Sequence, residues 1–561
     1  MSVFASRPWT AIWGPVEGFH DSTAFSSALD MFDRAVALRP DEALISYFDR
    51  TWTAAEADRE ADALAVQFEH AGLVAGDRVA LYLQNMPEFV IGVIAAWKIG
   101  AAVVPVNPMY RERELGHIAR DSGFKAIIAL DELLPVVDAV RPNSEIVLVI
   151  STNGLRCLDP GAPIPAPLAS VDAGLPGAEL TYDQVLERHL GAAPQRVAVT
   201  GGDTAFVAYT SGTTGPPKGA MLSHSGVVFS AQTFTSMRRL DSDDVIFAMA
   251  PLFHVTGLIC SLALGLALPA RIVLGYRFDV ETALALIDRY RVTFTVGPTT
   301  IFIAFLNHPQ SGEFDISSLT KIVCGGAPIP PSIVDRYEAA TGVYLHNGYG
   351  LTESTSPTFG TPDGARSPVN PESGSLALGV PVPDTDCKLV DDDGNEVGYG
   401  EPGEIVVRGP HVMLGYWNNP DETALAIDAD GWLRTGDVAT MDEDGWFYLV
   451  DRKKDQINAS GFKVWPQEVE EVLYEHPAVR EAGVVGVTDP YRGETVKAFV
   501  SLREGTHVER EELIDFCRAR LAAYKVPRMV QFLDELPKTA SGKITRRSLR
   551  DFTAESTASA T

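Results

Sequence analysis

Residues 209–219, YTSGTTGPPKG, bring together more anion-binding groups than any other stretch of this chain. Four hydroxyls, three glycines that leave backbone N–H groups accessible and the charge of Lys218 are groups with which proteins hold phosphate. The common nucleotide P-loop instead places Gly-Lys directly before Ser or Thr. The alternative is a flexible polar surface loop, but a linker needs neither the lysine nor the hydroxyls. The candidate anion-binding residues are Thr210, Ser211, Gly212, Thr213, Thr214, Gly215 and Lys218.

The segments on either side of this loop indicate how it is held. An apolar strand is predicted at residues 204–208, and a helix capped by Ser223 is predicted at residues 224–234. A strand, a glycine-rich loop and a helix are the layout of a phosphate cradle.

Two further motifs carry groups that suit a nucleotide. Residues 347–354, NGYGLTES, offer the ring of Tyr349 for a purine, the hydroxyl of Thr352, and Glu353 as a carboxylate for Mg²⁺. Residues 431–438, GWLRTGDV, set Asp437 in a glycine turn, where its carboxylate can accept both ribose hydroxyls. The alternatives are a strand end with a helix-capping Thr/Glu pair and an ordinary β-turn aspartate.

Basic residues mark the last two motifs. Residues 451–463, DRKKDQINASGFK, offer Arg452 to a ribose or phosphate, or form a solvated linker. Residues 536–547, LPKTASGKITRR, place Lys543 where its long stem can reach a developing anion. The nearby arginines Arg546, Arg547 and Arg550 are interpreted either as a solvated basic tail or as a contact for an anionic second substrate.

The composition limits the class of protein. A length of 561 residues fits two to four subdomains, and a formal net charge of −28 disfavours nucleic acid and broad anionic membrane surfaces as partners. Five scattered cysteines without a C-x-x-C pair predict free thiols in a reducing cytoplasm, without zinc. We expect no signal peptide, because the N-terminus has no basic flank followed by an apolar run. We also expect no transmembrane segment, because the longest apolar stretch, residues 255–270, is too short, so membrane contact is at most peripheral.

The hydrophobic pattern predicts two α/β units, then a β-rich unit and a small α+β unit. Residues 1–50 give little signal, and residues 151–200 are expected to be a connection with little structure. Strands are predicted at residues 78–83, 102–106, 125–130, 145–150, 245–248, 271–274, 292–296, 321–324, 343–346, 386–390, 403–408, 446–450, 482–487 and 496–502. Helices are predicted at residues 88–99, 111–121, 132–140, 255–270, 282–290, 299–307, 331–340, 466–475 and 510–522. The charged run at residues 451–455 predicts a domain boundary, giving domains at 1–453 and 454–561.

The five motifs, in this order, resemble the adenylate-forming superfamily of acyl-CoA synthetases, adenylation domains and luciferases. The motif-bearing match runs from the first loop to Lys543, and the α/β pattern extends it back to about residue 50. The resemblance implies an α/β fold, with a large N-terminal domain of two doubly wound subdomains plus a small distorted β-barrel, and a small mobile α+β C-terminal domain. It also implies that a carboxylic acid reacts with Mg·ATP to give an acyl-adenylate and pyrophosphate, after which a thiol displaces AMP.

The resemblance assigns roles to single residues of this chain. Residues 210–218 would grip the leaving phosphates, Glu353 with Thr210 would hold Mg²⁺, and Lys543 would stabilise the first transition state. The implied catalytic residues are Lys543, Thr352, which touches the α-phosphate, Glu353 and Lys218. The remaining implied residues are Gly326, Ala327, Pro328 and Tyr349 around adenine, Asn347 and Gly348 as further ATP- or AMP-binding residues, Asp437 and Arg452 at the ribose, Lys454 as the hinge and Gly461 on the pantetheine path of CoA.

The acid is expected to be uncharged apart from its carboxylate. Relatives that activate amino acids carry an aspartate near residues 251–254, where this chain has PLFH. The implied acyl pocket is His254, Val255 and Gly325, with His254 as a gate or wall, although a satisfied core histidine is the alternative. Residues 460–466, SGFKVWP, resemble fatty acyl-CoA synthetases, and Asn458 stands where luciferases carry a lysine, which disfavours a luminescent oxygenase.

The main hypothesis is therefore a medium- or long-chain fatty acyl-CoA ligase that uses ATP, an acid, CoA and Mg²⁺. The alternatives are a ligase for aryl acids such as cinnamates, an acyl-AMP ligase that loads a carrier protein, and a non-catalytic nucleotide-binding module. The chain length of the acid is not predicted, and a homodimer is left open.

Overall fold

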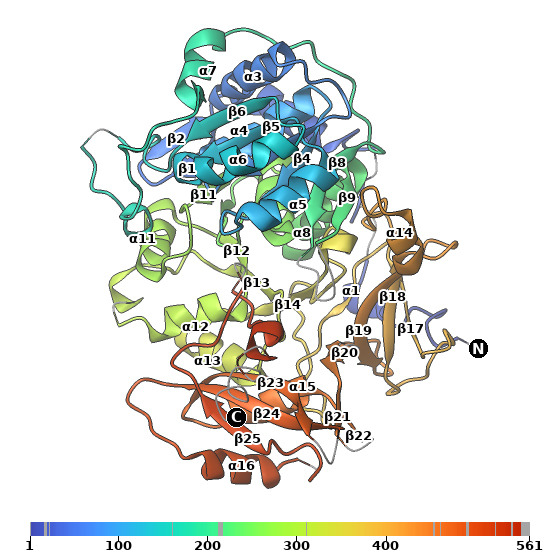
Figure 1. Ribbon diagram of the computed structural model, residues 1–561. Coiled ribbons are helices and arrows are strands. Elements are labelled where there is room, and N and C mark those ends of the chain that lie inside the picture. Colours follow the sequence, from blue (N-terminus) through green and yellow to red (C-terminus); the bar gives the residue numbers. More distant parts are fainter. Residues whose placement is uncertain are drawn as a thin grey trace.

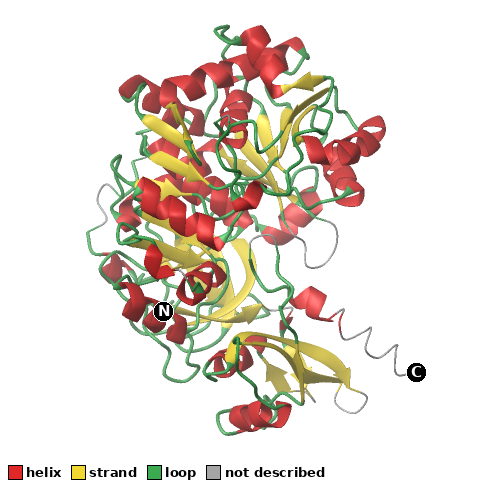
Figure 2. Ribbon diagram, turned by 90° about the vertical axis from the view of Figure 1, so that its left-hand side faces the viewer, coloured by secondary structure: helices red, strands yellow, loops and turns green. Residues whose placement is uncertain are grey.

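Two large sheets and two small ones make up the molecule (Figures 1 and 2). The computed structural model describes residues 2–15, 19–21, 23–159, 161–210, 217–309, 311–452, 455–459, 462–489, 493–521, 523–539, 542–550 and 552. At residues 311, 452, 458, 459, 462, 463 and 493 the description covers the backbone alone.

The first large sheet has seven strands in the order β7-β6-β5-β3-β4-β8-β9. Its pairs are parallel except β8–β9, which are antiparallel. The inner strands are runs of Val, Ile, Leu and Ala that are buried on both faces, as expected for a parallel sheet between helices. Its strands are β3 Arg78–Tyr82, β4 Ala102–Pro105, β5 Ala126–Leu130, β6 Leu148–Thr152, β7 Leu180–Thr181, β8 Thr204–Tyr209 and β9 Gly219–Ser223.

The second large sheet has nine strands in the order β16-β15-β14-β13-β12-β10-β11-β1-β2. Six neighbouring strands from β14 to β1 are parallel, and both edges are closed by antiparallel strands. The strands are β1 Ala43–Tyr47, β2 Arg50–Thr53, β10 Val245–Phe247, β11 Arg271–Leu274, β12 Phe294–Gly297, β13 Lys321–Gly325, β14 His346–Tyr349, β15 Phe359–Gly360 and β16 Val380–Pro381.

Helices fill the space between and around these sheets. Helix α4 is buried along its whole length and contacts β3 and β4 of one sheet and β1 of the other, which explains why it is apolar on every face. The helices of this part are α1 Thr10–Trp13, α2 Ala28–Leu38, α3 Ala54–His70, α4 Pro87–Lys98, α5 Glu112–Ser122, α6 Leu134–Val140, α7 Tyr182–His189, α8 His224–Arg238, α9 Val255–Gly257, α10 Leu264–Ala267, α11 Val280–Tyr290, α12 Thr299–Asn307 and α13 Pro331–Thr341.

Two smaller units follow in the chain. A four-stranded antiparallel sheet, β17-β18-β19-β20, lies beside the second large sheet, and a C-terminal sheet, β22-β21-β24-β23 with β25 paired to β24, has its own apolar cluster (Figure 1). The elements are β17 Asp386–Val390, β18 Gly403–Arg408, α14 Pro420–Ala426, β19 Leu433–Met441, β20 Phe447–Arg452, β21 Ile457–Ala459, β22 Phe462–Val464, α15 Pro466–Tyr474, β23 Val479–Asp489, β24 Gly493–Leu502, α16 Arg510–Arg518 and β25 Met529–Phe532.

Several sequence predictions are corrected by this fold. The apolar stretch at residues 255–270 is not one α-helix, because a π-helical segment, η4 (Leu258–Ala263), separates α9 from α10. Residues 151–200 are not structureless, since they contain β7 and α7. The strand predicted at residues 343–346 begins at His346 instead, so residues 347–349 belong to β14 and not to the loop after it.

Among the residues that the structure describes, no helix combines the length and apolar character needed to cross a lipid bilayer.

Candidate active site

The predicted phosphate-binding loop, residues 210–218, connects two antiparallel strands. Strand β8 ends at Tyr209 and β9 begins at Gly219, and Thr210 N donates to Lys218 O at 2.9 Å, which closes the base of the hairpin. The predicted strand–loop–helix cradle is therefore wrong, because β9 stands between the loop and α8. The Ser223 cap is confirmed, since its hydroxyl accepts from Gly226 N. The predicted residues Ser211, Gly212, Thr213, Thr214 and Gly215 lie outside the described residues.

Lys218 contacts two residues of the segment 416–422, and one of these two reaches Glu353. Its Nζ lies 2.8 Å from Glu422 Oε2 and 4.4 Å from the centroid of the Tyr416 ring. The Tyr416 hydroxyl in turn donates to Glu353 Oε1 at 2.9 Å. The predicted pyrophosphate-binding lysine and the predicted metal carboxylate thus contact one tyrosine. Burial and the two carboxylates raise the pKa of Tyr416, so its hydroxyl stays a donor at neutral pH.

Tyr349 and Asp437 contact each other directly. The Tyr349 hydroxyl donates to Asp437 Oδ2 at 2.6 Å, and the Tyr349 ring packs edge-on against Phe359 with centroids 5.5 Å apart. Asp437 is 5% exposed and lies within β19 rather than in a turn, so that part of the prediction is corrected. The backbone of Asp437 pairs with that of Arg452 on β20, which brings the two predicted ribose-binding positions side by side.

Asn347 supports this arrangement from within the sheet. Its side chain is buried and Nδ2 donates to Ala377 O at 2.9 Å. The side-chain amide is thus used inside the protein, whereas Thr352 and Glu353 follow β14 in a short 3₁₀-helix, η6 (Thr352–Ser354), and are half-buried.

Gly325, at the end of β13, lies too close to Gly348 of β14 to carry a side chain. A Cβ added to Gly325 would lie 2.5 Å from Gly348 O, and Gly326 has a φ of +86°. These glycines leave the carboxyl ends of the parallel strands open, which is where ligands bind in such sheets. Ala327 is half-buried, and Pro328 is exposed beside them.

The structure brings Lys543 to these strand ends. A Cβ added to Gly326 would lie 2.9 Å from Lys543 Cε and 3.6 Å from its Nζ. The preceding Gly542 rests against Pro298 and Thr300, and Thr300 Oγ1 lies 3.5 Å from Gly542 O. The C-terminal loop therefore docks at the ends of β12 and β13 on the large domain.

His254 lies near the same lysine. Its Nδ1 accepts from Thr256 N at 3.3 Å and caps α9, while the next residue, Val255, is buried. Burial, assisted by the charge of Lys543, lowers the pKa of His254 to about 3. The imidazole is therefore neutral at physiological pH, which suits a wall for an uncharged chain better than a proton donor or acceptor.

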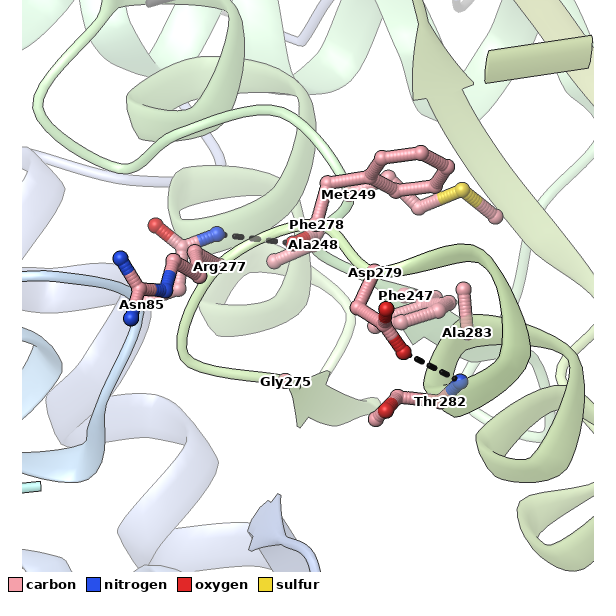
Figure 3. Close-up of a pocket in the computed structure, with 10 residues that line it drawn as sticks. All are labelled: Asn85, Phe247, Ala248, Met249, Gly275, Arg277, Phe278, Asp279, Thr282 and Ala283. Carbon is pink, nitrogen blue, oxygen red and sulfur yellow. Dashed lines mark hydrogen bonds between the residues drawn. The ribbon is translucent and has the colours of Figure 1, made fainter. Parts of the chain in front are cut away.

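A small pocket adjoins the segment that leads to His254 (Figure 3). Asn85 lines one side of it (Figure 3), with Nδ2 donating to Ala248 O at 2.8 Å and to Ala250 O at 3.0 Å, and Oδ1 accepting from Leu252 N at 2.7 Å. Asn85 thus fixes the backbone after β10 that carries the predicted acyl pocket. The pocket is lined by Asn85, Phe247, Ala248, Met249, Gly275, Arg277, Phe278, Asp279, Thr282 and Ala283.

The basic cluster after Lys543 is not a solvated tail. Arg546 forms ion pairs with Asp451 at 2.6 Å, with Glu470 at 2.8 Å and with Asp455 at 3.5 Å. Arg550 also pairs with Asp455, at 3.0 Å. The solvated-tail interpretation is therefore corrected for these two arginines, and Arg546 joins the C-terminal segment to β20 and α15. The predicted hinge residue Lys454 and the predicted CoA-path residue Gly461 lie outside the described residues.

Tyr416 and Glu422 were missed by sequence reasoning. Neither belongs to a charged or glycine-rich run that points to chemistry on its own. The available signal was Gly415-Tyr416 before Pro420, a helix start, but this pattern is also common in ordinary loops.

Comparison with protein families gives two matches. A family described as AMP-binding enzyme matches residues 32–417, and one described as AMP-binding enzyme C-terminal domain matches residues 468–543.

Individual relatives cover almost the whole chain. The chain is 37% identical over 559 residues to a long-chain-fatty-acid–CoA ligase of Bacillus subtilis (strain 168), covering 97% of this chain and 98% of that protein. It is 36% identical over 521 residues to a feruloyl-CoA synthase of Amycolatopsis sp, covering 92% and 97%.

Solved structures agree with these matches. The anthranilate CoA ligase AuaEII in complex with anthranoyl-AMP has a TM-score of 0.84 and 27% identity, covering 95% of this chain and 99% of that chain. ATP-bound MatB from Rhodopseudomonas palustris has a TM-score of 0.80 and 26% identity, covering 94% and 99%. With a family match over more than half of its length and near-complete relatives, the chain belongs to the AMP-binding enzyme family.

Proposed function

We propose that this protein activates a medium- or long-chain fatty acid with ATP and transfers the acyl group to CoA. The fatty acid carboxylate attacks the α-phosphate of ATP, and pyrophosphate leaves. The CoA thiol then displaces AMP from the acyl-adenylate to give the thioester. The observation that carries the proposal is the position of Lys543, which a separate part of the chain brings to the strand ends beside Gly326.

The described residues support a separate binding role for each side chain around these strand ends. Lys218 would hold the leaving phosphates and Thr352 would contact the α-phosphate. Tyr349 would cover adenine, and its partner Asp437 would bind the ribose. Lys543 would neutralise charge that develops at the α-phosphate, where a fixed cation in a partly dry site is most effective.

Mg²⁺ fits the residues at this site. A magnesium ion that is bound with a nucleotide needs only one or two protein carboxylates, because phosphates and water supply the other oxygens. Glu353 is a half-buried carboxylate whose Oε1 is oriented by Tyr416, and Thr210 offers a hydroxyl at the end of β8. We propose Glu353, with Thr210, as the protein ligands; the bound ion would neutralise phosphate charge.

The domain division at residues 453 and 454 is part of the proposal. The C-terminal unit, residues 454–561, would turn about Lys454 between the two half-reactions, and Gly461 would then line the path of pantetheine. We place the enzyme in the cytoplasm, because all five cysteines are buried free thiols.

An aryl acid is the second candidate substrate class. The feruloyl-CoA synthase relative, at 36% identity, favours it directly, since its similarity nearly equals that of the fatty-acid ligases. Loading of a carrier protein has less support, because the Bacillus subtilis ligase, the feruloyl-CoA synthase and AuaEII are all named as CoA enzymes.

An assay of AMP release tests the proposal. AMP formation is measured with medium-chain, long-chain, branched and cinnamic-type acids, each with and without CoA. We expect CoA-dependent AMP release that is fastest with a fatty acid. Preference for cinnamic acids would move the assignment to the aryl class, and no release with any acid would contradict catalysis altogether.

A further inference from the structure

Tyr416 stands between two groups that the proposed function uses. Its hydroxyl donates to Glu353 Oε1 at 2.9 Å, and its ring lies 4.4 Å from Lys218 Nζ. The same ammonium group also pairs with Glu422 Oε2 at 2.8 Å. One side chain therefore contacts the carboxylate proposed for Mg²⁺ and the cation proposed for pyrophosphate.

The backbone around Tyr416 is fixed to the strand that follows the phosphate loop. Trp417 N donates to Gly219 O at 2.7 Å, and Met221 N donates to Gly415 O at 2.9 Å. These bonds pair the tyrosine segment with β9, whose first residue directly follows Lys218. The position of Tyr416 is thus set by the same hairpin that carries the lysine.

Helix α14 fixes the tyrosine from the other side. Tyr416 N donates to the Thr423 hydroxyl at 2.8 Å, and Glu422 lies on the same helix. Gly415 has a φ of +136°, and a Cβ there would lie 2.7 Å from Thr423 Cγ2. The positive φ and this close approach favour glycine at position 415, and the following residue, Tyr416, is only 7% exposed.

The hydroxyl contact restricts the carboxylate by geometry. The Tyr416 hydroxyl lies within hydrogen-bonding distance of Glu353 Oε1, at 2.9 Å, and a carboxylate that accepts such a bond from a buried side chain is restricted in rotation. Groups that orient a metal-binding carboxylate in this way strengthen metal binding without touching the metal.

We propose that Tyr416 is a positioning residue that aims the Glu353 carboxylate at Mg²⁺ and holds it in register with Lys218. The inference rests on the proposed function, because it assumes that Glu353 binds the metal. In this role the Tyr416 hydroxyl sets the Mg²⁺ concentration that adenylation requires, and the Tyr416 ring contacts the Lys218 ammonium group.

The test is a magnesium titration of acid-dependent ATP–pyrophosphate exchange in the full-length protein. Tyr416→Phe removes the hydroxyl but keeps the ring under Lys218. We expect the Mg²⁺ concentration for half-maximal exchange to rise roughly tenfold or more, with the KM for the acid unchanged. Tyr448→Phe is the matched control, because Tyr448 on β20 is also buried and donates to a carboxylate, Asp442 Oδ2, at 2.8 Å.

Two further variants distinguish an error in the proposed metal ligand from an error in the proposed positioning residue. Glu353→Gln should raise the magnesium requirement by itself, and Tyr416→Phe should add little in that background, because there is no carboxylate left to orient. If Glu353→Gln leaves the titration unchanged, the proposed metal ligand is wrong. If Glu353→Gln raises the requirement but Tyr416→Phe behaves like Tyr448→Phe, the positioning role of Tyr416 is overturned.

Discussion

Gly326 shows how a single missing side chain shapes the site. Its φ of +86° favours glycine, and the space that a Cβ would fill is taken by the Lys543 stem at 2.9 Å. A methyl group there would both strain the backbone and displace the lysine. Residue 326 must therefore be glycine for Lys543 to reach the strand ends in this position.

Gly326→Ala should therefore impair the first half-reaction selectively. We expect ATP–pyrophosphate exchange to fall on the order of 10-fold to 100-fold, because a misplacement of about 1 Å is sufficient for such losses. Transfer from preformed acyl-AMP to CoA should be spared. Gly342→Ala is the matched control, since Gly342 has a similar φ of +75° but nothing within 4 Å of the added Cβ. Equal exchange rates in the two variants would contradict the proposed contact.

Buried histidines make stability depend on pH. His411 is fully buried and stacks on Phe229, and burial lowers its pKa to about 3, against 6.5 in an unfolded chain. Between pH 6.5 and pH 3 the unfolded state binds the proton and the folded state does not. This histidine therefore costs no stability above pH 6.5 and lowers stability progressively as the pH falls below it.

His411→Phe should reduce the acid sensitivity of the protein. Relative to wild type, we expect the variant to lose about 1 kcal/mol less unfolding free energy between pH 7.5 and pH 5.5. The comparison must be with wild type, because burial raises the pKa of Glu471 to about 8, which gives a pH dependence of opposite sign in both proteins. The free energy of unfolding in urea is measured at the two pH values. Equal changes in wild type and variant would refute the assignment of this acid sensitivity to His411.

At the scale of elements, the Arg546 cluster joins three parts of the chain. Arg546 links its own C-terminal segment to Asp451 on β20 and to Glu470 on α15. Arg546 also lies three residues after Lys543, so the same ion pairs that hold this segment hold the loop that presents the lysine. Removing the arginine would break its ion pairs with two largely buried carboxylates, Asp451 and Glu470.

Arg546→Met should destabilise the protein by about 3–5 kcal/mol, the usual cost of breaking a buried ion pair from one side. Arg547→Met is the control, because Arg547 is the adjacent arginine and is exposed, where substitutions change stability by about 0.5 kcal/mol or less. Chemical unfolding curves of both variants are compared with wild type. Similar midpoints for the two substitutions would show that the cluster contributes little.

Elements with a clear apolar pattern were predictable from the sequence. The strands at residues 271–274, 386–390 and 403–408 and the helix at residues 299–307 have the predicted bounds. Strand β9 was missed because Gly219 and the short apolar run that follows it show no alternation of apolar and polar residues. Strand β19 was missed because Gly436 before Asp437 is typical of a turn, whereas tertiary pairing with β18 and β20 keeps it extended.

At the scale of the whole molecule, the site is assembled from segments that are far apart in the sequence. Local motifs were enough to single out Lys218, Glu353, Asp437 and Lys543, because each is a charged residue in a glycine-containing or hydroxyl-containing run. They could not show that Tyr416 contacts two of these groups, since that arrangement depends on pairing between β9 and a distant loop. They also could not distinguish an arginine in a buried ion cluster from one in a solvated tail.

The central claim is that Lys543, carried by the C-terminal unit, serves adenylation at the strand ends of the large domain. Measuring both half-reactions of Lys543→Ala tests it most directly, with Lys538→Ala as control, because Lys538 lies in the same segment but pairs with Glu481 at 2.7 Å. We predict that Lys543→Ala lowers acid-dependent ATP–pyrophosphate exchange on the order of 10²-fold or more. The variant should still convert preformed acyl-AMP and CoA to acyl-CoA. Exchange at the wild-type rate in Lys543→Ala would contradict the account.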